Sequence, residues 1–169
     1  CYWFPDYLAD LEALLDHYAG DKAIDLIGHS MGANIAGLYA GVRPPRVARL
    51  INLEGFGLPT TQARMAPGRY AKWLDELREP PAMRAYASRD EVLMKTNPRI
   101  SLHRAQFLAG QWAAPDEQGK WQILGDPAHK LTNPVLYQTE EVLACWEKIT
   151  APVLWVEADN TDIWRWMGD

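Results

Sequence analysis

Apolar residues near the start of the chain recur at the spacing of a helix. The positions are three or four residues apart: Leu8, Leu11, Leu14, Leu15 and Tyr18. Such a stripe predicts an amphipathic helix over residues 6–18, with Asp6 as its N-cap and Gly20 after its end. The next apolar run, residues 23–27, is short and continuous, which is typical of a strand in a parallel sheet that is covered on both faces.

A second helix and a second strand follow at once. Residues 33–41 are rich in alanine and glycine, which indicates a helix that approaches a sheet closely, and two prolines at 44–45 end it. Residues 50–53 predict the next strand, and residues 54–57 a loop. Helix, strand, helix and strand in short order predict an α/β fold with an open parallel sheet.

The pattern changes after about residue 58 and becomes mostly helical. The predicted elements are helices at 69–78, 89–96 and 102–112, a short strand at 120–124, a helix from Thr139 and a strand at 152–156. Ser88 and Glu91 have the spacing of a capping box before the second of these helices, and Thr139 is expected to cap the last helix. The chain therefore combines sheet elements, a mostly helical insertion and a return to the sheet.

Composition and charge exclude some classes of protein. The 169 residues are 48% hydrophobic, which is enough for a sizeable core. The chain has 17 Lys and Arg against 22 Asp and Glu, a net charge of −5, so it offers no basic surface and we expect no nucleic-acid partner. No apolar run approaches the roughly 20 residues of a membrane span, and we expect no membrane partner.

The two cysteines, Cys1 and Cys145, make neither a disulfide framework nor a metal-ligand spacing. We expect both to be plain thiols, with no metal and no cofactor in the protein. Free thiols favour a reducing compartment, which predicts a cytoplasmic location. The chain also has eight tryptophans and seven tyrosines, which indicate an aromatic core or a roomy apolar pocket.

The run Gly28-His29-Ser30-Met31-Gly32 matches G-x-S-x-G, the pattern of a nucleophile elbow. In an elbow the serine stands clear of the sheet on a sharp strand-to-helix turn, where side chains in place of Gly28 and Gly32 are expected to clash. The turn also directs the backbone N–H of Met31 toward a developing oxyanion. Ser30 is therefore the candidate nucleophile and Met31 the candidate oxyanion donor, whereas we expect His29 to make packing or polar contacts.

On these residues the chain resembles the α/β-hydrolase superfamily. Residues 24–33 are similar to its fifth strand, elbow and following helix, residues 43–52 to the run into its sixth strand, and residues 149–156 to its seventh. Residues 96–101 and the stretch through Trp121 resemble the serine-hydrolase-like subgroup. The resemblance implies a partial α/β-hydrolase parallel sheet, its fifth to seventh strands with flanking helices, and a mostly helical cap inserted between the last two strands.

That arrangement predicts three parts. Residues 1–58 form the hydrolase core with the elbow, residues 59–138 form the cap, and residues 139–169 return to the core with the acid-bearing strand end. Four aromatic side chains of the cap either contact an apolar acyl substrate or fill the cap's own core. They are Tyr70, Trp73, Trp112 and Trp121.

The resemblance also implies a catalytic acid after the seventh strand. Asp162 is the first choice, because it stands four residues beyond Ala158, where the family usually has glycine. Asp159 is one alternative. Glu54 is another, because it follows the sixth strand, where some relatives keep their acid. For each carboxylate the competing interpretation is a turn or loop residue with no catalytic role.

The triad order of the family is Ser, then Asp or Glu, then His. No histidine follows Asp162 in this sequence, and none of the four that precede it is favoured as the base, although His129 is considered for the pocket. They are His17, His29, His103 and His129. The chain also starts at Cys1 without a methionine. We therefore expect a fragment that lacks both ends, with the histidine and the second oxyanion donor outside it.

The function that these residues and the resemblance imply is a serine hydrolase for a carboxylic ester or a similar small-molecule acyl substrate. Ser30 forms an acyl-enzyme that water then hydrolyses. Serine at the elbow argues against haloalkane dehalogenases and epoxide hydrolases, which need aspartate there. Acyl transfer to a small acceptor, hydrolysis of a carbon–carbon bond and a non-catalytic binding protein on the same fold stay open as alternatives.

Overall fold

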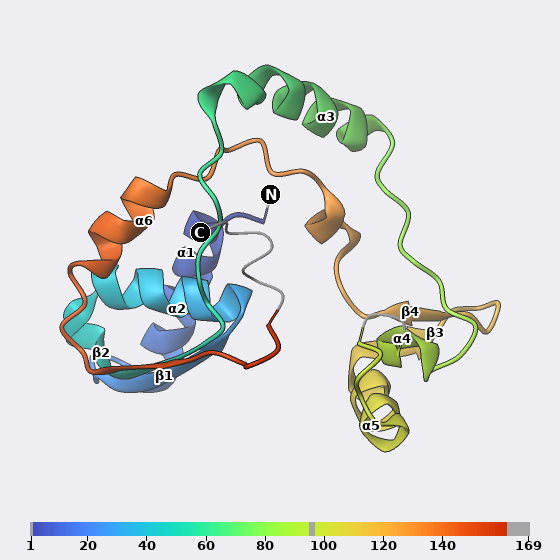
Figure 1. Cartoon of the computed structure of the whole chain (residues 1–169), viewed down its shortest axis with the longest axis horizontal. Helices are drawn as coiled ribbons and strands as arrows, with labels where there is room; N and C mark the ends of the chain where they lie inside the picture. The colour runs from blue at the N-terminus through green and yellow to red at the C-terminus, as the bar shows by residue number, and fades with distance from the viewer. Residues whose placement is uncertain (1, 95–96, 162–169) are drawn as a thin grey trace. The chain divides into compact units, whose positions relative to one another are not determined.

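The computed structural model describes residues 2–94 and 97–161, and these form two compact units (Figure 1). We call residues 2–69 with 133–161 the core unit, and residues 70–132 the cap unit. The cap unit falls within residues 59–138, the segment predicted as an insertion.

The core unit contains a three-stranded parallel sheet with the order β1-β2-β5. Its elements are α1 (Phe4–Ala19), β1 (Ile24–His29), α2 (Met31–Val42), the 3-10 helices η1 (Pro44–Arg46) and η2 (Ala63–Met65), β2 (Val47–Leu53), α6 (Thr139–Trp146) and β5 (Val153–Val156). Each predicted strand and helix of the core is therefore present, with the strand bounds shifted by up to three residues. The strand order is the one that the fifth, sixth and seventh strands of the superfamily imply.

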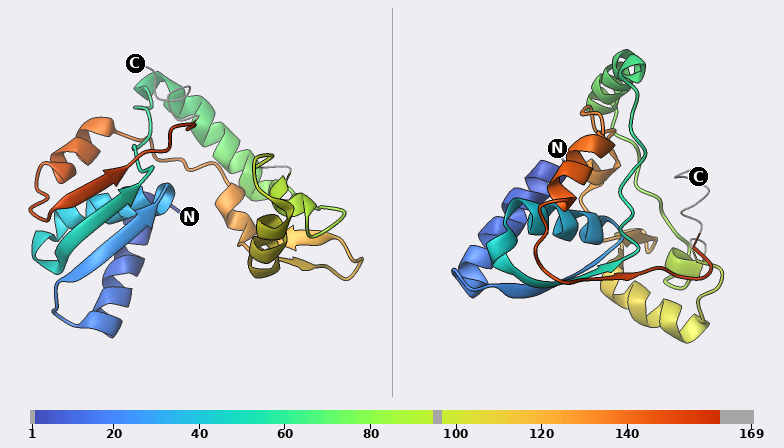
Figure 2. Two further views of the ribbon diagram at one scale, coloured as in Figure 1. Left: turned by 60° about the horizontal axis from the view of Figure 1, so that its bottom comes forward. Right: turned by 60° about the vertical axis from the view of Figure 1, so that its left-hand side comes forward.

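In the core unit α1, α2 and α6 lie on one face of the sheet (Figure 2). The residues of α2 from Ala33 to Gly41 are all buried. Its glycines let it pack closely, because a Cβ at Gly41 would overlap the carbonyl of Cys145. Tyr39 and Leu50 are among the largest fully buried side chains, so the centre of the core lies between α2 and β2.

The opposite face of the sheet carries exposed apolar side chains in register. Ile27 pairs with Ile51, and Ile51 pairs with Leu154. Ile27 and Leu154 are 66% and 58% exposed. Both faces of a parallel sheet are normally covered, so this face differs from the one that carries the helices.

The cap unit packs a small core of its own. Its elements are α3 (Ala66–Arg78), which begins in the core unit, α4 (Glu91–Met94), α5 (Leu102–Trp112), the antiparallel strands β3 (Ala113–Pro115) and β4 (Trp121–Ile123), and the 3-10 helix η3 (Pro127–Lys130). The buried cluster consists of Tyr86, Val92, Leu93, Ala105, Ala109 and Ala113. Three of its six members are alanines, so this core has little apolar volume.

Two of the expected helix caps are wrong, and one of the two bonds of the expected capping box is present. Trp3, not Asp6, is the N-cap of α1, and the Asp6 carboxylate accepts a bond from the Trp3 N–H at 3.0 Å. Thr139 is the first residue of α6 rather than its cap, and its hydroxyl donates to the Leu58 carbonyl at 3.2 Å. The Ser88 hydroxyl accepts from the Glu91 N–H at 3.3 Å, as predicted, but in the described part of the chain the Glu91 carboxylate accepts from the Ala87 N–H at 3.0 Å and not from Ser88.

Among the helices in residues 2–94 and 97–161, none combines the length and the apolar character that a membrane crossing requires.

Candidate active site

Ser30 lies on the turn between β1 and α2, at the carboxyl end of the sheet. Its φ is 51° and its ψ is −118°, in the region that residues with side chains rarely adopt. The Ser30 N–H donates to the Leu53 carbonyl at 2.8 Å, and the Ser30 carbonyl accepts from the N–H groups of Ala33 and Asn34. The backbone of Ser30 is therefore held on both sides, and its side chain is exposed.

The two glycines of the elbow differ in what surrounds them. A Cβ at Gly28 would overlap the carbonyl of Gly32 and the backbone of Ala33, so the turn needs glycine at this position. At Gly32 no described atom lies within 4 Å of an added Cβ, apart from its two chain neighbours and the backbone of its own helix. The clash expected from the motif is confirmed at Gly28 and does not occur at Gly32 among the described residues.

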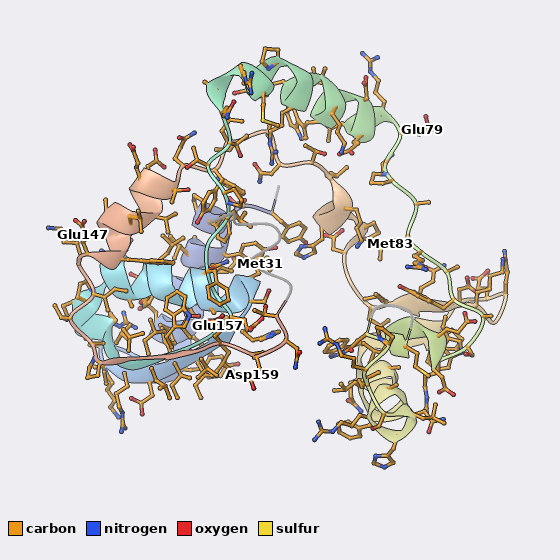
Figure 3. All side chains as sticks on the ribbon, in the orientation of Figure 1. Met31, Glu79, Met83, Glu147, Glu157 and Asp159 are labelled. Carbon is orange, nitrogen blue, oxygen red and sulfur yellow. The ribbon has the colours of Figure 1, made fainter. Side chains whose placement is uncertain are left out.

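Met31 is the first residue of α2, labelled in Figure 3. The N–H groups in the first turn of a helix have no partner within the helix, and the positive end of the helix dipole lies there. The Met31 N–H is therefore placed beside Ser30 with the polarity that an oxyanion needs.

Glu54 is the residue directly after β2, beside the elbow. Among the described residues other than glycine, Ser30 and Glu54 are the two with positive φ, and the φ of Glu54 is 59°. The Glu54 N–H donates to the Val156 carbonyl at 3.0 Å. Its carboxylate accepts from the Ala158 N–H at 2.6 Å and from the Thr161 hydroxyl at 2.9 Å. Glu54 thus connects the end of β2 to the segment after β5.

Of the other two acid candidates, the structure describes one. Asp162 lies outside the described residues. Asp159 is exposed in the segment after β5 (Figure 3). The Phe56 and Trp155 rings lie 5.6 Å apart between centroids, so the turn after β2 also contacts β5 through an aromatic pair.

No hydrogen bond between Ser30 and any of the four histidines is seen among the described residues. His17 lies in the last turn of α1, which leads into the amino end of β1, opposite to the elbow. His29 ends β1 with an exposed side chain. His103 and His129 belong to the cap unit, on α5 and η3. The general base stays unassigned among them.

The four cap aromatics differ in burial. Trp121 packs against the buried cluster of the cap unit, and its backbone pairs with Tyr86. Tyr70 and Trp112 are both 50% exposed, and Trp73 is intermediate. Trp121 therefore serves the cap's own core, whereas Tyr70 and Trp112 keep half of their surface available for contact.

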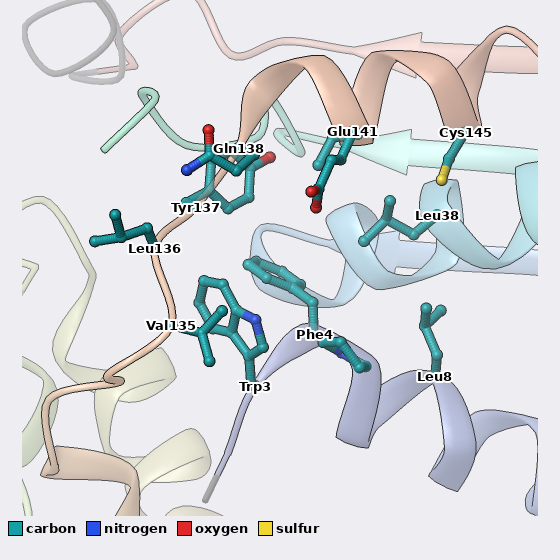
Figure 4. Close-up of a pocket in the computed structure, with 12 residues that line it drawn as sticks. Trp3, Phe4, Leu8, Leu38, Val135, Leu136, Tyr137, Gln138, Glu141 and Cys145 are labelled. Atoms are coloured by element: carbon teal, nitrogen blue, oxygen red, sulfur yellow. The ribbon is translucent and has the colours of Figure 1, made fainter. Parts of the chain in front are cut away.

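The core unit also has an apolar pocket of about 190 Å³ between α1, α2 and α6 (Figure 4). Trp3, Phe4, Leu38 and Tyr137 line it, together with the Cys145 side chain on α6. Ser30 is not among the lining residues. The pocket is therefore separate from the elbow.

In the part of the chain that the structure describes, no group of three or more His, Cys, Asp or Glu residues could hold a metal ion. Cys145 is a free thiol of intermediate burial, and Cys1 lies outside the described residues.

Comparison with known proteins identifies the family. A family model described as the alpha/beta hydrolase fold matches residues 2–165, and the chain belongs to this family. A serine hydrolase-like protein from Danio rerio is 26% identical over 163 residues, which cover 90% of this chain and 49% of that protein. The chain therefore spans about half the length of this curated relative.

Two solved structures share the fold. A hypothetical protein of Pseudomonas aeruginosa PAO1 is 27% identical with a TM-score of 0.81, over 94% of this chain and 57% of that one. The thioesterase domain from the curacin biosynthetic pathway is 24% identical with a TM-score of 0.77, over 95% of this chain and 57% of that one. The second likeness is evidence for the fold alone.

Proposed function

We propose that this protein is a serine hydrolase that cleaves a carboxylic ester or a similar acyl compound, with Ser30 as its nucleophile. The observation that carries the proposal is the backbone of Ser30, held at φ 51° between β1 and α2. Strained residues persist only where the surroundings hold them, and they cluster at active sites. The name of the Danio rerio relative, a serine hydrolase-like protein, supports the same class.

In the proposed reaction the Ser30 Oγ attacks the acyl carbon while a histidine takes the hydroxyl proton. The carbonyl oxygen becomes an oxyanion that accepts a hydrogen bond from the Met31 N–H. The tetrahedral intermediate then breaks its bond to the leaving alcohol, which receives the proton from the histidine. Water attacks the resulting Ser30 ester by the same route and releases the carboxylic acid.

For the acid that orients this histidine, we propose Glu54, with Asp162 and Asp159 as the alternatives. Family resemblance makes Asp162 the first choice, but the described geometry supports Glu54. It follows the strand next to the elbow, and Ser30 bonds to the residue before it. Among the described residues, each carboxylate oxygen of Glu54 accepts from one donor, and a carboxylate oxygen can accept two, which leaves room for an imidazole N–H.

The test of the proposed function uses a fluorophosphonate probe on the full-length gene product. We expect labelling of the wild-type protein and of the control Ser88→Ala, whose serine lies in the cap unit, and no labelling of Ser30→Ala. Turnover of p-nitrophenyl esters is expected to follow the same pattern. Labelling that survives in Ser30→Ala would overturn the assignment.

Product analysis decides the type of reaction. With an added alcohol or thiol acceptor, we expect free carboxylic acid as the main product. An acyl-acceptor adduct as the main product would instead indicate an acyltransferase. Turnover of diketones without turnover of esters would indicate a carbon–carbon bond hydrolase. A wild-type protein that the probe does not label would favour a non-catalytic binding protein.

A further inference from the structure

Two buried asparagines lie beside the elbow, and the proposed reaction leaves both unused. Asn34 is 8% exposed on α2, and Asn52 is 1% exposed on β2. A polar side chain in such a place costs free energy unless it is hydrogen-bonded. The bonds that these two side chains make therefore show what keeps them in the core.

Asn52 closes the turn that follows its own strand. Its Oδ1 accepts from the Gly55 N–H at 2.8 Å, and its Nδ2 donates to the Gly55 carbonyl at 3.2 Å. A Cβ on Gly55 would lie 2.5 Å from the Ala33 Cβ and 2.7 Å from the Asn52 Oδ1. The turn is thus pressed against the start of α2, with no room for a side chain at residue 55.

Asn34 connects the same turn to the nucleophile. Its backbone N–H donates to the Ser30 carbonyl at 3.1 Å, and its side-chain Oδ1 accepts from the Gly57 N–H at 2.8 Å. Gly57 has a φ of 81°, a conformation that suits glycine. One residue therefore bonds both to Ser30 and to the far end of the turn.

Glu54 is the first residue of the turn that these amides hold. Its own φ of 59° is unfavourable in a residue other than glycine, so neighbouring bonds must maintain it. Its carboxylate reaches Ala158 and Thr161 in the segment after β5. A turn that relaxed would move Glu54 away from these donors and away from the elbow.

We propose that Asn34 and Asn52 are positioning residues of the hydrolytic site, which fix the turn at residues 54–57 and with it the Glu54 carboxylate relative to Ser30. This inference rests on the proposed function. The two side chains act through the backbone of Gly55 and Gly57 and touch neither substrate nor the reacting atoms. A carboxylate misplaced by about 1 Å costs on the order of 10²-fold in rate.

The primary test compares Asn34→Ala with Asn34→Asp in the full-length gene product. Alanine removes the acceptor for the Gly57 N–H, whereas aspartate keeps it. For Asn34→Ala we expect kcat and the rate of fluorophosphonate labelling to fall about 10²-fold, with KM changed by less than about twofold. We expect Asn34→Asp to recover most of the lost kcat.

Amide hydrogen exchange provides a readout that does not depend on activity. In Asn34→Ala the peptide that contains residues 54–57 should exchange faster, while peptides from β1 keep their protection. Asn97→Ala is the matched control, because Asn97 also caps a local turn with its side chain, through the Arg99 N–H, but in the cap unit. This control should change neither kcat nor the exchange of the turn.

Asn52→Asp, which keeps the acceptor and loses the donor to the Gly55 carbonyl, is expected to lower kcat less than Asn52→Ala does. If the Asn52 variants do not fold, the comparison of Asn34→Ala with Asn34→Asp is sufficient to test the proposal. Wild-type kcat and exchange in Asn34→Ala would overturn the proposal while the Ser30 assignment stands. Faster exchange of the turn in a protein whose Ser30 the probe never labels would instead overturn the proposed function, and the positioning role with it.

Discussion

The core unit and the cap unit differ in the size of their buried side chains. In the core unit a parallel sheet packs against a helix with nine consecutive buried residues, and the large side chains of Tyr39 and Leu50 are fully enclosed. In the cap unit half of the buried cluster is alanine. Its helices keep large apolar side chains at the surface, of which Phe107 on α5 is 65% exposed.

This difference assigns separate tasks to the two regions. The strained backbones of Ser30 and Glu54 both lie in the core unit, at adjacent strand ends, where close packing can hold them. The cap unit has no comparable strain among its described residues other than glycine. We infer that the core unit supplies the chemistry, and that the exposed apolar side chains of the cap unit are available for contact with an acyl group.

The largest expected effect concerns the acid in the core unit. We expect Glu54→Gln to lower kcat by about 10³–10⁴, because an amide no longer stabilises the imidazolium that forms during acylation. Asp162→Asn and Asp159→Asn should be mild by comparison. Steady-state turnover of a p-nitrophenyl ester measures all three. A large decrease of kcat in Asp162→Asn with a small one in Glu54→Gln would instead assign the catalytic acid to Asp162, in the segment after β5.

Glycine-to-alanine substitutions compare the packing of the two units directly. Gly28→Ala is expected to destabilise the protein by about 3 kcal/mol, because the new methyl group overlaps backbone atoms at the elbow. Among the described residues beyond its own helix, the new methyl group of Gly110→Ala on α5 meets the Arg89 guanidinium alone, at 3.7 Å, and this change should stabilise the protein by about 1 kcal/mol.

Urea unfolding at neutral pH measures both changes. Equal destabilisation by the two substitutions would show that the cap unit is packed as tightly as the core unit.

Two tryptophans of the cap unit, one half-exposed and one packed in its core, are expected to differ in their effects on substrate binding and stability. Trp112→Ala removes a half-exposed ring, so we expect KM for a long-chain ester to rise about tenfold with little change in Tm. Trp121→Ala removes a ring from the cap's buried cluster and should lower Tm. Kinetics with short and long acyl chains, together with thermal melts, separate the two effects. A Trp112→Ala variant with unchanged KM for every ester would exclude that ring from substrate contact.

The smallest expected effect lies between α1 and α2. The Tyr39 hydroxyl donates to the Glu12 carboxylate at 2.5 Å, and Tyr39→Phe should destabilise the protein by about 1 kcal/mol near neutral pH. Burial, followed by the bond to Glu12, raises the pKa of Tyr39 from 10.0 to about 12.

A tyrosine with a raised pKa in the folded state stabilises the fold below its unfolded pKa and loses that stabilisation as pH rises through the folded value. The difference between wild type and Tyr39→Phe should therefore shrink between pH 10 and pH 12. Urea unfolding at pH 8 and at pH 11 measures the change. An equal difference at both values would contradict the assignment.

Much of the fold could be predicted because its signals are local. The apolar stripe of α1, the continuous run of β1 and the small residues of α2 each lie within a few turns of chain, and all three elements are present. The hairpin of β3 and β4 shows where such signals end. The continuous run at 120–124 predicts β4, but β3 has three residues, two of them alanine, directly after α5, and the sequence pattern does not separate it from that helix.

At the candidate site, the sequence alone predicted Ser30 and Met31 as candidates, because a nucleophile elbow is a single run of five residues whose glycine spacing reflects one backbone turn. Only the tertiary structure shows the hydrogen bonds of the Asn34 and Asn52 side chains and the strained conformation of Glu54. The Glu54 carboxylate bonds to a residue 104 positions away, and Asn34 bonds to one 23 positions away. Partners so distant leave no periodic trace in the sequence, because folding the sheet is what brings the strand ends together.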